Sequence, residues 1–115
     1  MDKQQAKASV KMQRVSARKA RLVADLIRNK DVRVALGILN NTNKKSSELF
    51  IKLLNSAIAN ATNNHGMDAT KLFIQEILVN EGPTLKRYQP HSQGRAFSIL
   101  KRTSNLSITL EERDL

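Results

Sequence analysis

The residues with the clearest chemical potential are cations at the start of a predicted helix. Ser16 is a favourable N-cap. It is followed within two turns by Arg18, Lys19 and Arg21. Acidic side chains are preferred at this end, because the helix dipole already supplies positive potential there. The arrangement is unfavourable for stability, but backbone N–H groups, the dipole and cations together are suited to binding phosphate.

Four arginines recur near the spacing of one helical stripe, namely Arg14, Arg18, Arg21 and Arg28. Asp25 lies four residues after Arg21 and three before Arg28, so we expect its carboxylate to orient both guanidinium groups. The alternative is an ordinary ladder of surface ion pairs, worth roughly a few tenths of a kcal/mol each. We favour phosphate binding, because cations are gathered at the wrong end of the helix for stability alone.

A second basic segment begins at Gly82. From there to about Ser98 no apolar periodicity is sustained, and loops longer than about 12–15 residues are uncommon in compact domains unless they are functional. If both halves continue the neighbouring strands, they form an arm that reaches roughly 25 Å. Residues 82–110 contain no carboxylate and five cations: Lys86, Arg87, Arg95, Lys101 and Arg102.

The arm also offers groups other than cations. Tyr88 supplies a ring for stacking, and Gly94 allows a close backbone approach. Mixtures of cations, aromatic rings and accessible backbone are typical of sites for single-stranded or irregular RNA. The alternative is a flexible basic hairpin with no fixed partner. The length of the segment and its lack of acidic residues favour the RNA-binding interpretation.

Composition supports a polyanionic partner. The 115 residues include 20 Lys and Arg against 10 Asp and Glu, and the net charge is +10. The excess is confined to residues 1–30 and 82–110, with a neutral segment between them. No signal peptide or membrane span is evident, so we expect a soluble cytoplasmic chain that does not associate with membranes.

Catalytic and metal sites are not predicted. The chain has no Cys, which excludes disulfides, thiolate nucleophiles and Cys-based zinc sites. His65 and His91 are too few and too far apart to indicate a metal centre. No nucleophile elbow, phosphate-binding glycine loop or carboxylate pair is present. We therefore predict no enzymatic activity, no catalytic residue, no metal and no cofactor.

The hydrophobic pattern predicts an α+β fold. We expect a strand over Ala6–Met12, a helix from Ser16 to about Asn29, a short helix capped by Asp31, and a longer one opened by Thr42 or Asn43 and ended near Gly66. Strands follow at about 71–80 and 105–110. The first of these strands has two apolar parities, with Phe73, Ile77 and Val79 on one and Leu72, Ile74 and Leu78 on the other.

This order predicts a single domain over residues 1–115. Three helices pack on a small three-stranded antiparallel sheet, and two of the strands extend into a long β-hairpin arm at about 82–98.

Several motifs resemble the bacterial ribosomal large-subunit protein L-twenty-two family. They are Arg14-Val-Ser-Ala-Arg-Lys-Ala-Arg21, Asn43-Lys-Lys45, Ser56-Ala-Ile-Ala-Asn-Ala61, Asn80-Glu-Gly-Pro-Thr-Leu-Lys-Arg87, Gly94-Arg-Ala96 and Leu100-Lys-Arg-Thr-Ser104, in the order of that family. The resemblance implies a structural constituent of the large subunit that binds its rRNA, acts early in subunit assembly and lines the nascent-peptide exit tunnel with its hairpin. It also implies that changes at the hairpin tip affect macrolide sensitivity.

The expected partners are large-subunit rRNA, neighbouring large-subunit ribosomal proteins including L-four, and the nascent peptide in the tunnel, with no homo-oligomer. The predicted rRNA contacts of the body are Lys7, Lys11, Arg14, Arg18, Lys19, Arg21, Arg28, Lys30, Lys44 and Lys45. Those of the arm, which also line the tunnel, are Lys86, Arg87, Tyr88, Gln89, Pro90, His91, Gln93, Gly94, Arg95, Lys101 and Arg102.

The chain departs from the family pattern at three places. His91-Ser92 stands where the family usually has Arg-Ala, which removes one cation at the tip; Asn29 replaces a usual Gly and Asn105 a usual His. Two other classes of protein are considered. A DNA-binding regulator would use the first two helices as a helix-turn-helix unit, but the second helix offers only Arg33 for reading bases. An RNA-modifying enzyme would need a catalytic site, and none is predicted.

Overall fold

The computed structural model describes residues 4–42, 44–83, 85–90 and 96–113. Along the chain these form β1 (Gln5–Gln13), α1 (Ala17–Ile27), α2 (Val32–Asn41), α3 (Lys45–Ala59), β2 (Leu72–Glu81), β3 (Leu85–Pro90), β4 (Ala96–Lys101) and β5 (Ser104–Glu112). A π-helical turn, Asn60–Asn64, extends α3, and a 3-10 turn, Ala69–Lys71, precedes β2.

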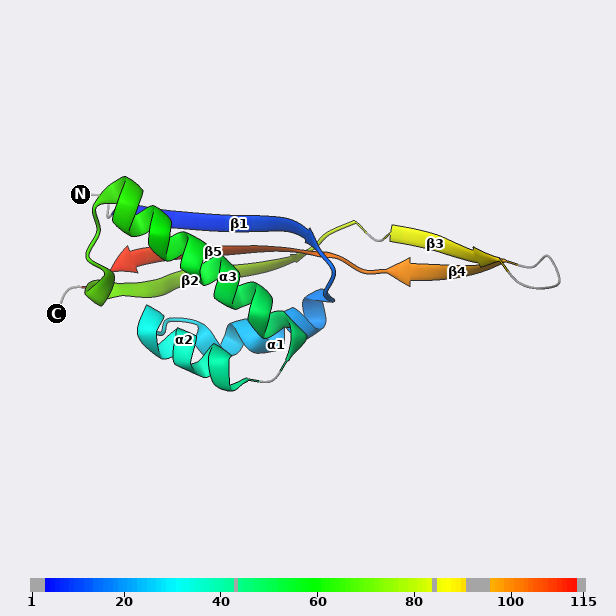
Figure 1. The fold of residues 1–115 in the computed structure, drawn as a ribbon, viewed down its shortest axis with the longest axis horizontal. Coiled ribbons are helices and arrows are strands. Elements are labelled where there is room, and N and C mark those ends of the chain that lie inside the picture. Colours follow the sequence, from blue (N-terminus) through cyan, green and yellow to red (C-terminus); the bar gives the residue numbers. More distant parts are fainter. Residues whose placement is uncertain (1–3, 43, 84, 91–95, 114–115) are drawn as a thin grey trace.

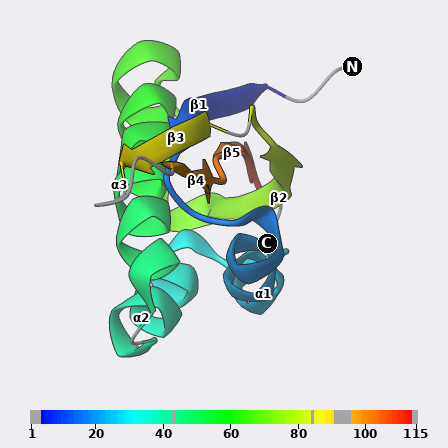
Figure 2. The same cartoon turned by 90° about the vertical axis from the view of Figure 1, so that its right-hand side faces the viewer.

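The body is a three-stranded antiparallel sheet with helices on one of its faces (Figures 1 and 2). The strand order is β1-β5-β2, so the last strand lies in the centre. Apolar residues of all three strands meet the apolar faces of the helices in one core, as the pairings Ala6↔Leu110 and Ile77↔Ile108 illustrate. The predicted α+β class is therefore confirmed. None of the described helices is long and apolar enough to cross a lipid bilayer.

Helix α1 begins as its sequence predicts. Ser16 is the N-cap, and its Oγ accepts a hydrogen bond from the backbone N–H of Lys19 at 3.3 Å. The buried face of α1 follows the helical period: Ala17, Ala20, Val23, Ala24 and Ile27. The helix ends at Ile27, two residues before the predicted end: Arg28 already has an extended backbone with ψ of 132°, and Asn29 follows in a left-handed conformation with φ of 62°.

The start of α3 differs from the prediction. Thr42 belongs to the end of α2, where its hydroxyl donates to the carbonyl of Ile38 at 2.7 Å, and Asn43 lies outside the described residues. Lys44 occupies the N-cap position and provides no side-chain cap. The predicted end near Gly66 is confirmed, since this glycine has φ of 63°.

A β-bulge explains the two apolar parities of β2. The register with β5 shifts between Ile74 and Glu76, so one extra residue is inserted in β2. Leu72, Ile74, Ile77 and Val79 are all buried as a result, although their spacing is not strictly even. Leu78 is 43% exposed. The bulge therefore accounts for apolar residues on both parities, which a constant period of two does not explain.

A second irregularity ends the alternation of β1, in which the apolar residues Ala6, Ala8, Val10 and Met12 are separated by polar ones. Its register with β5 shifts between Val10 and Gln13, and Met12 has φ of 56°. Met12 is consequently 49% exposed rather than on the buried face with Ala6. The bend lies immediately before α1 and leads the chain from the sheet toward that helix (Figure 1).

The hairpin is a separate two-stranded sheet that projects from the body (Figure 1). β3 pairs with β4 from Leu85↔Lys101 to Pro90↔Ala96. The principal extents of the molecule, 66 × 28 × 20 Å, reflect this projection. The predicted arm is confirmed, with its paired strands at 85–90 and 96–101 where the prediction placed the arm at about 82–98. At its base the Gly82 N–H donates to the Thr103 carbonyl at 2.9 Å, and the Thr103 hydroxyl donates to the Pro83 carbonyl.

The close approach at Gly82 leads to a testable prediction. A Cβ at this position would lie 2.6 Å from Thr103 Oγ1, so Gly82→Ala must displace the Thr103 side chain. We expect a loss of about 1–3 kcal/mol in the free energy of unfolding, measured by chemical denaturation. Gly37→Ala in α2 is the matched control, because nothing lies within 4 Å of its Cβ position. Alanine should stabilise that helix by about 0.5–1 kcal/mol. Equal effects of the two substitutions would contradict the close contact.

Candidate nucleic-acid interface

The N-terminus of α1 presents cations to solvent. Arg18 and Lys19 are exposed in its first turn, and that turn contains no acidic residue. The N-terminal N–H groups and the helix dipole add positive potential at the same place. This confirms the predicted charge arrangement, although binding of phosphate by these residues stays a prediction.

A hollow of about 530 Å³ lies between the starts of α1 and α3, and we call it the α1–α3 hollow. Its cationic lining consists of Arg14, Lys19, Lys44 and Lys45. These four residues come from two segments that are far apart in sequence, and the fold brings them to one place. The remaining lining residues, Val15, Ser16, Leu22 and Ser46, include no acid.

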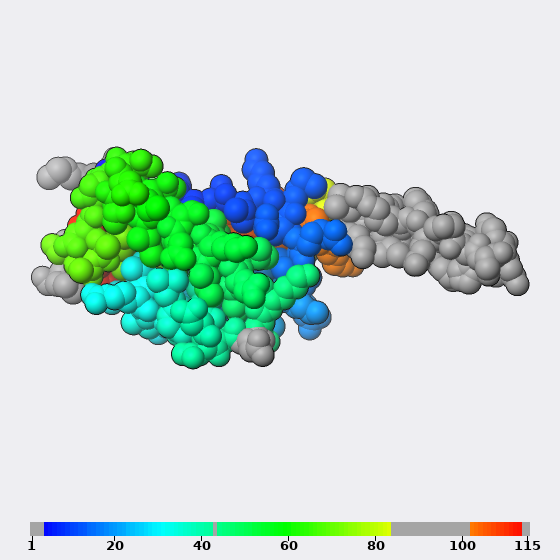
Figure 3. All heavy atoms as spheres, in the orientation of Figure 1, coloured from blue at the N-terminus to red at the C-terminus, as the bar shows by residue number. Residues whose placement is uncertain are grey.

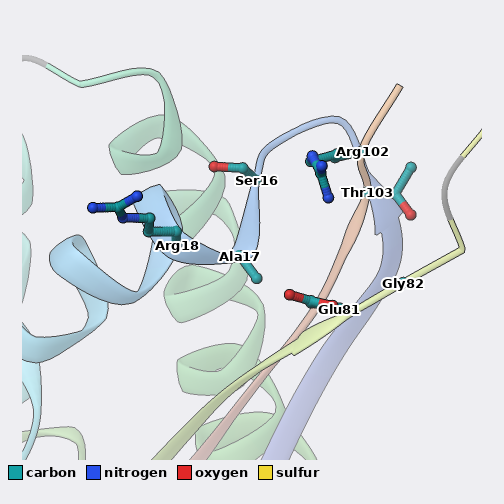
Figure 4. Close-up of a pocket in the computed structure, with 7 residues that line it drawn as sticks. All are labelled: Ser16, Ala17, Arg18, Glu81, Gly82, Arg102 and Thr103. Atoms are coloured by element: carbon teal, nitrogen blue, oxygen red, sulfur yellow. The ribbon is translucent and has the colours of Figure 1, made fainter. Parts of the chain in front are cut away.

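A second hollow of about 400 Å³ lies at the base of the hairpin, on the other side of Ser16, and we call it the hairpin-base hollow (Figure 4). It is lined by Ser16, Ala17, Arg18, Glu81, Gly82, Arg102 and Thr103. Arg102 extends over it from the strand side, whereas the guanidinium of Arg18 points away from Glu81. Cations predicted separately for body and arm therefore meet near one hollow. Among the described residues, Glu81 is the only acidic one that lines it.

Figure 3 shows where this region lies on the surface. The blue segment that contains the β1–α1 connection and the orange segment that follows β4 lie together at the hairpin end of the body. Sequence reasoning treated residues 31–81 as a neutral spacer and so missed Ser46 and Glu81, and it also missed Leu22 in the first basic segment. One signal was available for Leu22: it is apolar but falls outside the buried period of α1.

Arg21 and Arg28 make intramolecular bonds that the sequence did not predict. Arg21 Nη2 donates to the Val79 carbonyl at 3.1 Å, and Arg28 Nη1 donates to the Ile77 carbonyl at 3.0 Å. Both carbonyls belong to β2, an edge strand whose outward backbone groups need partners from outside the sheet. The two arginines therefore hold α1 against the sheet edge.

The predicted role of Asp25 is correct for one arginine only. Its carboxylate lies 3.2 Å from Arg28 Nη2, while the described hydrogen bond of the Arg21 guanidinium goes to the sheet edge. The Asp25–Arg28 pair is largely exposed and so contributes little. The four-arginine stripe is also incomplete, because Arg14 lies in the connection before α1 rather than on the helix.

The other predicted body contacts lie outside both hollows. Lys7 and Lys11 are exposed on β1, and Lys7 pairs in register with Thr109. Lys30 is exposed after α1, where its carbonyl accepts a hydrogen bond from the Ile74 N–H at 3.0 Å. These lysines would extend the basic surface but do not contribute to the hollows.

The arm residues are placed through strand pairing. Lys86, Arg87 and Tyr88 pair with Leu100, Ile99 and Ser98, and Gln89 and Pro90 pair with Phe97 and Ala96. Lys101 ends β4, opposite Leu85. The predicted tip residues His91, Gln93, Gly94 and Arg95 lie outside the described residues. Across the described ranges, no group of three or more His, Asp or Glu side chains could hold a metal ion.

A small α+β body with basic hollows at the root of a protruding hairpin is suited to binding structured RNA. The family model described as Ribosomal protein L22p/L17e matches residues 8–111. The chain is 83% identical over 113 residues to "Large ribosomal subunit protein uL22" of Mycoplasmopsis agalactiae, covering 98% of this chain and 99% of that protein. It is 76% identical over 110 residues to the protein of the same name in Mycoplasmopsis synoviae, with 96% and 97% coverage.

The chain belongs to the ribosomal protein L22p/L17e family. It is a structural protein of the large ribosomal subunit and not an enzyme. The resemblance seen in the sequence is thereby confirmed. The two alternatives, a DNA-binding regulator and an RNA-modifying enzyme, are not supported.

Proposed function

We propose that the chain binds large-subunit rRNA through the α1–α3 hollow, the hairpin-base hollow and the hairpin. The observation that carries this proposal is the convergence of cations from separate segments around the N-terminus of α1, at the root of a basic hairpin. Phosphates of a folded RNA are the natural counterions for such a surface. Lys7, Lys11 and Lys30 would add contacts at its margins, and Arg21 and Arg28 would contribute chiefly by holding α1 in place.

The hairpin and the body would have different tasks in the subunit. The hairpin, a two-stranded sheet separate from the body, is suited to line the exit tunnel, where the nascent peptide and protein L-four would be its neighbours. The compact body would join segments of rRNA early in subunit assembly. This division of tasks rests on family membership and on the projection of the hairpin. It requires no second copy of the chain.

Competition between nucleic acids tests the rRNA proposal. At equal ionic strength, we expect a structured large-subunit rRNA fragment to bind at least about tenfold more tightly than a DNA duplex of similar length. A-form geometry, irregular backbone and unpaired bases are features that duplex DNA lacks. Fluorescence anisotropy with labelled RNA and unlabelled competitors would measure the ratio. Equal affinities would mean that the surface recognises charge alone and would contradict the proposal.

A further inference from the structure

The α1–α3 hollow is more than a patch of charge, because two helices begin at it. α1 starts at Ala17 and α3 at Lys45, and residues from both first turns line the hollow. The N-cap of α3 is Lys44, which offers no side-chain acceptor to the first-turn N–H groups. Glu48, the acidic residue in the first turn of α3, lines neighbouring hollows and not this one. Two helix dipoles and four cations therefore favour an anion at the same position.

The same hollow has an apolar side. Leu22 is 57% exposed and is the most exposed of the large hydrophobic side chains among the described residues. It lines the hollow together with Val15, which is buried. Leu22 lies off the buried face of α1, so its side chain gives the hollow an apolar surface that a ligand can reach beside the four cations.

The volume of the hollow limits what it can accept. At about 530 Å³ it lies within the range of roughly 300–1,000 Å³ that is usual for small-ligand sites. A duplex keeps its bases stacked inside and presents mainly phosphates to a cationic surface. An unpaired nucleotide presents both a phosphate and an apolar base face. Only the second matches a site with a cationic side and an apolar side.

We infer that the α1–α3 hollow is a site for one unpaired RNA nucleotide. Its phosphate lies at the convergence of the α1 and α3 N-termini, among Lys19, Lys44 and Lys45, and its base packs against Leu22. This inference rests on the proposed rRNA binding and adds the class of RNA element that the hollow selects. Leu22 acts as a specificity residue, because it contacts the base and carries no charge.

The test uses the full chain and three short RNA hairpins of equal charge. One carries a single-nucleotide bulge with 2-aminopurine as the bulged base, the second carries an abasic bulge, and the third carries the same 2-aminopurine within a paired stem. We expect the first to bind at least about fivefold more tightly than the abasic form, because only the first presents a base that can pack against Leu22. We also expect the bulged 2-aminopurine, and not the paired one, to change its fluorescence on binding.

Two substitutions test separately how the base and the phosphate contribute to binding. Leu22→Ala should bring the ratio of affinities for the base-bearing and abasic bulges close to one and leave the salt dependence unchanged. Leu26→Ala is the matched control, since Leu26 is 45% exposed one turn later on α1 and does not line the hollow. It should preserve the ratio. Lys45→Ala should lower the affinity for the base-bearing and the abasic bulge equally, by about fivefold. It should also lower the slope of log affinity against log salt by about 0.7–0.9.

The inference would be overturned if the wild type bound the base-bearing and abasic bulges with nearly equal affinity. Equal reductions of that affinity ratio in Leu22→Ala and Leu26→Ala would overturn it as well. So would a Lys45→Ala variant that binds both bulged RNAs as the wild type does. If rRNA binding and its salt dependence persist in any of these cases, the proposed function stands and only the selection of an unpaired nucleotide fails. If none of the RNAs, including the large-subunit fragment, binds with measurable salt dependence, both proposals fail.

Discussion

Replacing Lys19, Lys44 and Lys45 together with alanine is expected to lower the affinity for large-subunit rRNA by on the order of a hundredfold at physiological salt. Each lysine that neutralises a phosphate releases counterions, so the loss of three contacts removes a large electrostatic contribution. The slope of log affinity against log salt should fall by about 2–3. Titrations at several salt concentrations measure both quantities.

The matched control removes the same charge elsewhere. Arg33, Lys52 and Lys71 are exposed and line neither the α1–α3 hollow nor the hairpin-base hollow. Their triple alanine variant should weaken binding by less than about tenfold, since distant charges are largely screened at this ionic strength. Similar losses in both triples would show that net charge, rather than the hollow, determines binding. Arg21 and Arg28 are left unchanged in both variants, because their removal would also loosen α1 from β2.

Deleting Lys86–Gly94 is expected to leave the thermal unfolding of the body within a few degrees of the wild type, while association with large-subunit rRNA becomes much weaker and no longer survives a high-salt wash. β3 and β4 pair with each other in a sheet of their own. The described core comes from the helices and from β1, β2 and β5. Calorimetry measures the first expectation, and co-sedimentation with large subunits through a high-salt wash measures the second.

A full-length variant distinguishes the shape of the hairpin from its charge. Lys86→Ala with Arg87→Ala removes two cations from the deleted segment but keeps the paired strands. It should melt like the wild type and lose only part of the salt-resistant association. A fall of more than about 10 °C in the melting temperature of the deletion variant would mean that the hairpin contributes to the core of the body, which would contradict the separation of the two sheets.

Much of this protein follows from local sequence. The period of the apolar residues in α1 determines which face is buried, and Ser16 determines where that helix starts. The basic segment after Gly82 is too long and too polar to pack as an ordinary loop, so a projecting arm follows from composition. These features depend on residues within a few positions of one another, and this is why spacing alone predicts them.

Other features depend on contacts between distant segments. The β2 bulge exists because two pairs of buried residues must both face the helices when β2 pairs with β5. Arg21 and Arg28 have structural partners because β2 is an edge strand, a position that is defined only when the sheet is assembled.

The candidate site itself has the same origin. Local sequence determined that cations gather at the start of α1 and in the arm, and that a family of RNA-binding ribosomal proteins is the match. Only the tertiary structure decided that Arg14, Lys19, Lys44 and Lys45 line one hollow together with Leu22, and that Glu81 and Arg102 line another. The physical reason is that the order of charged residues is visible in the sequence. A binding site, by contrast, forms only when helices that are far apart in sequence pack together.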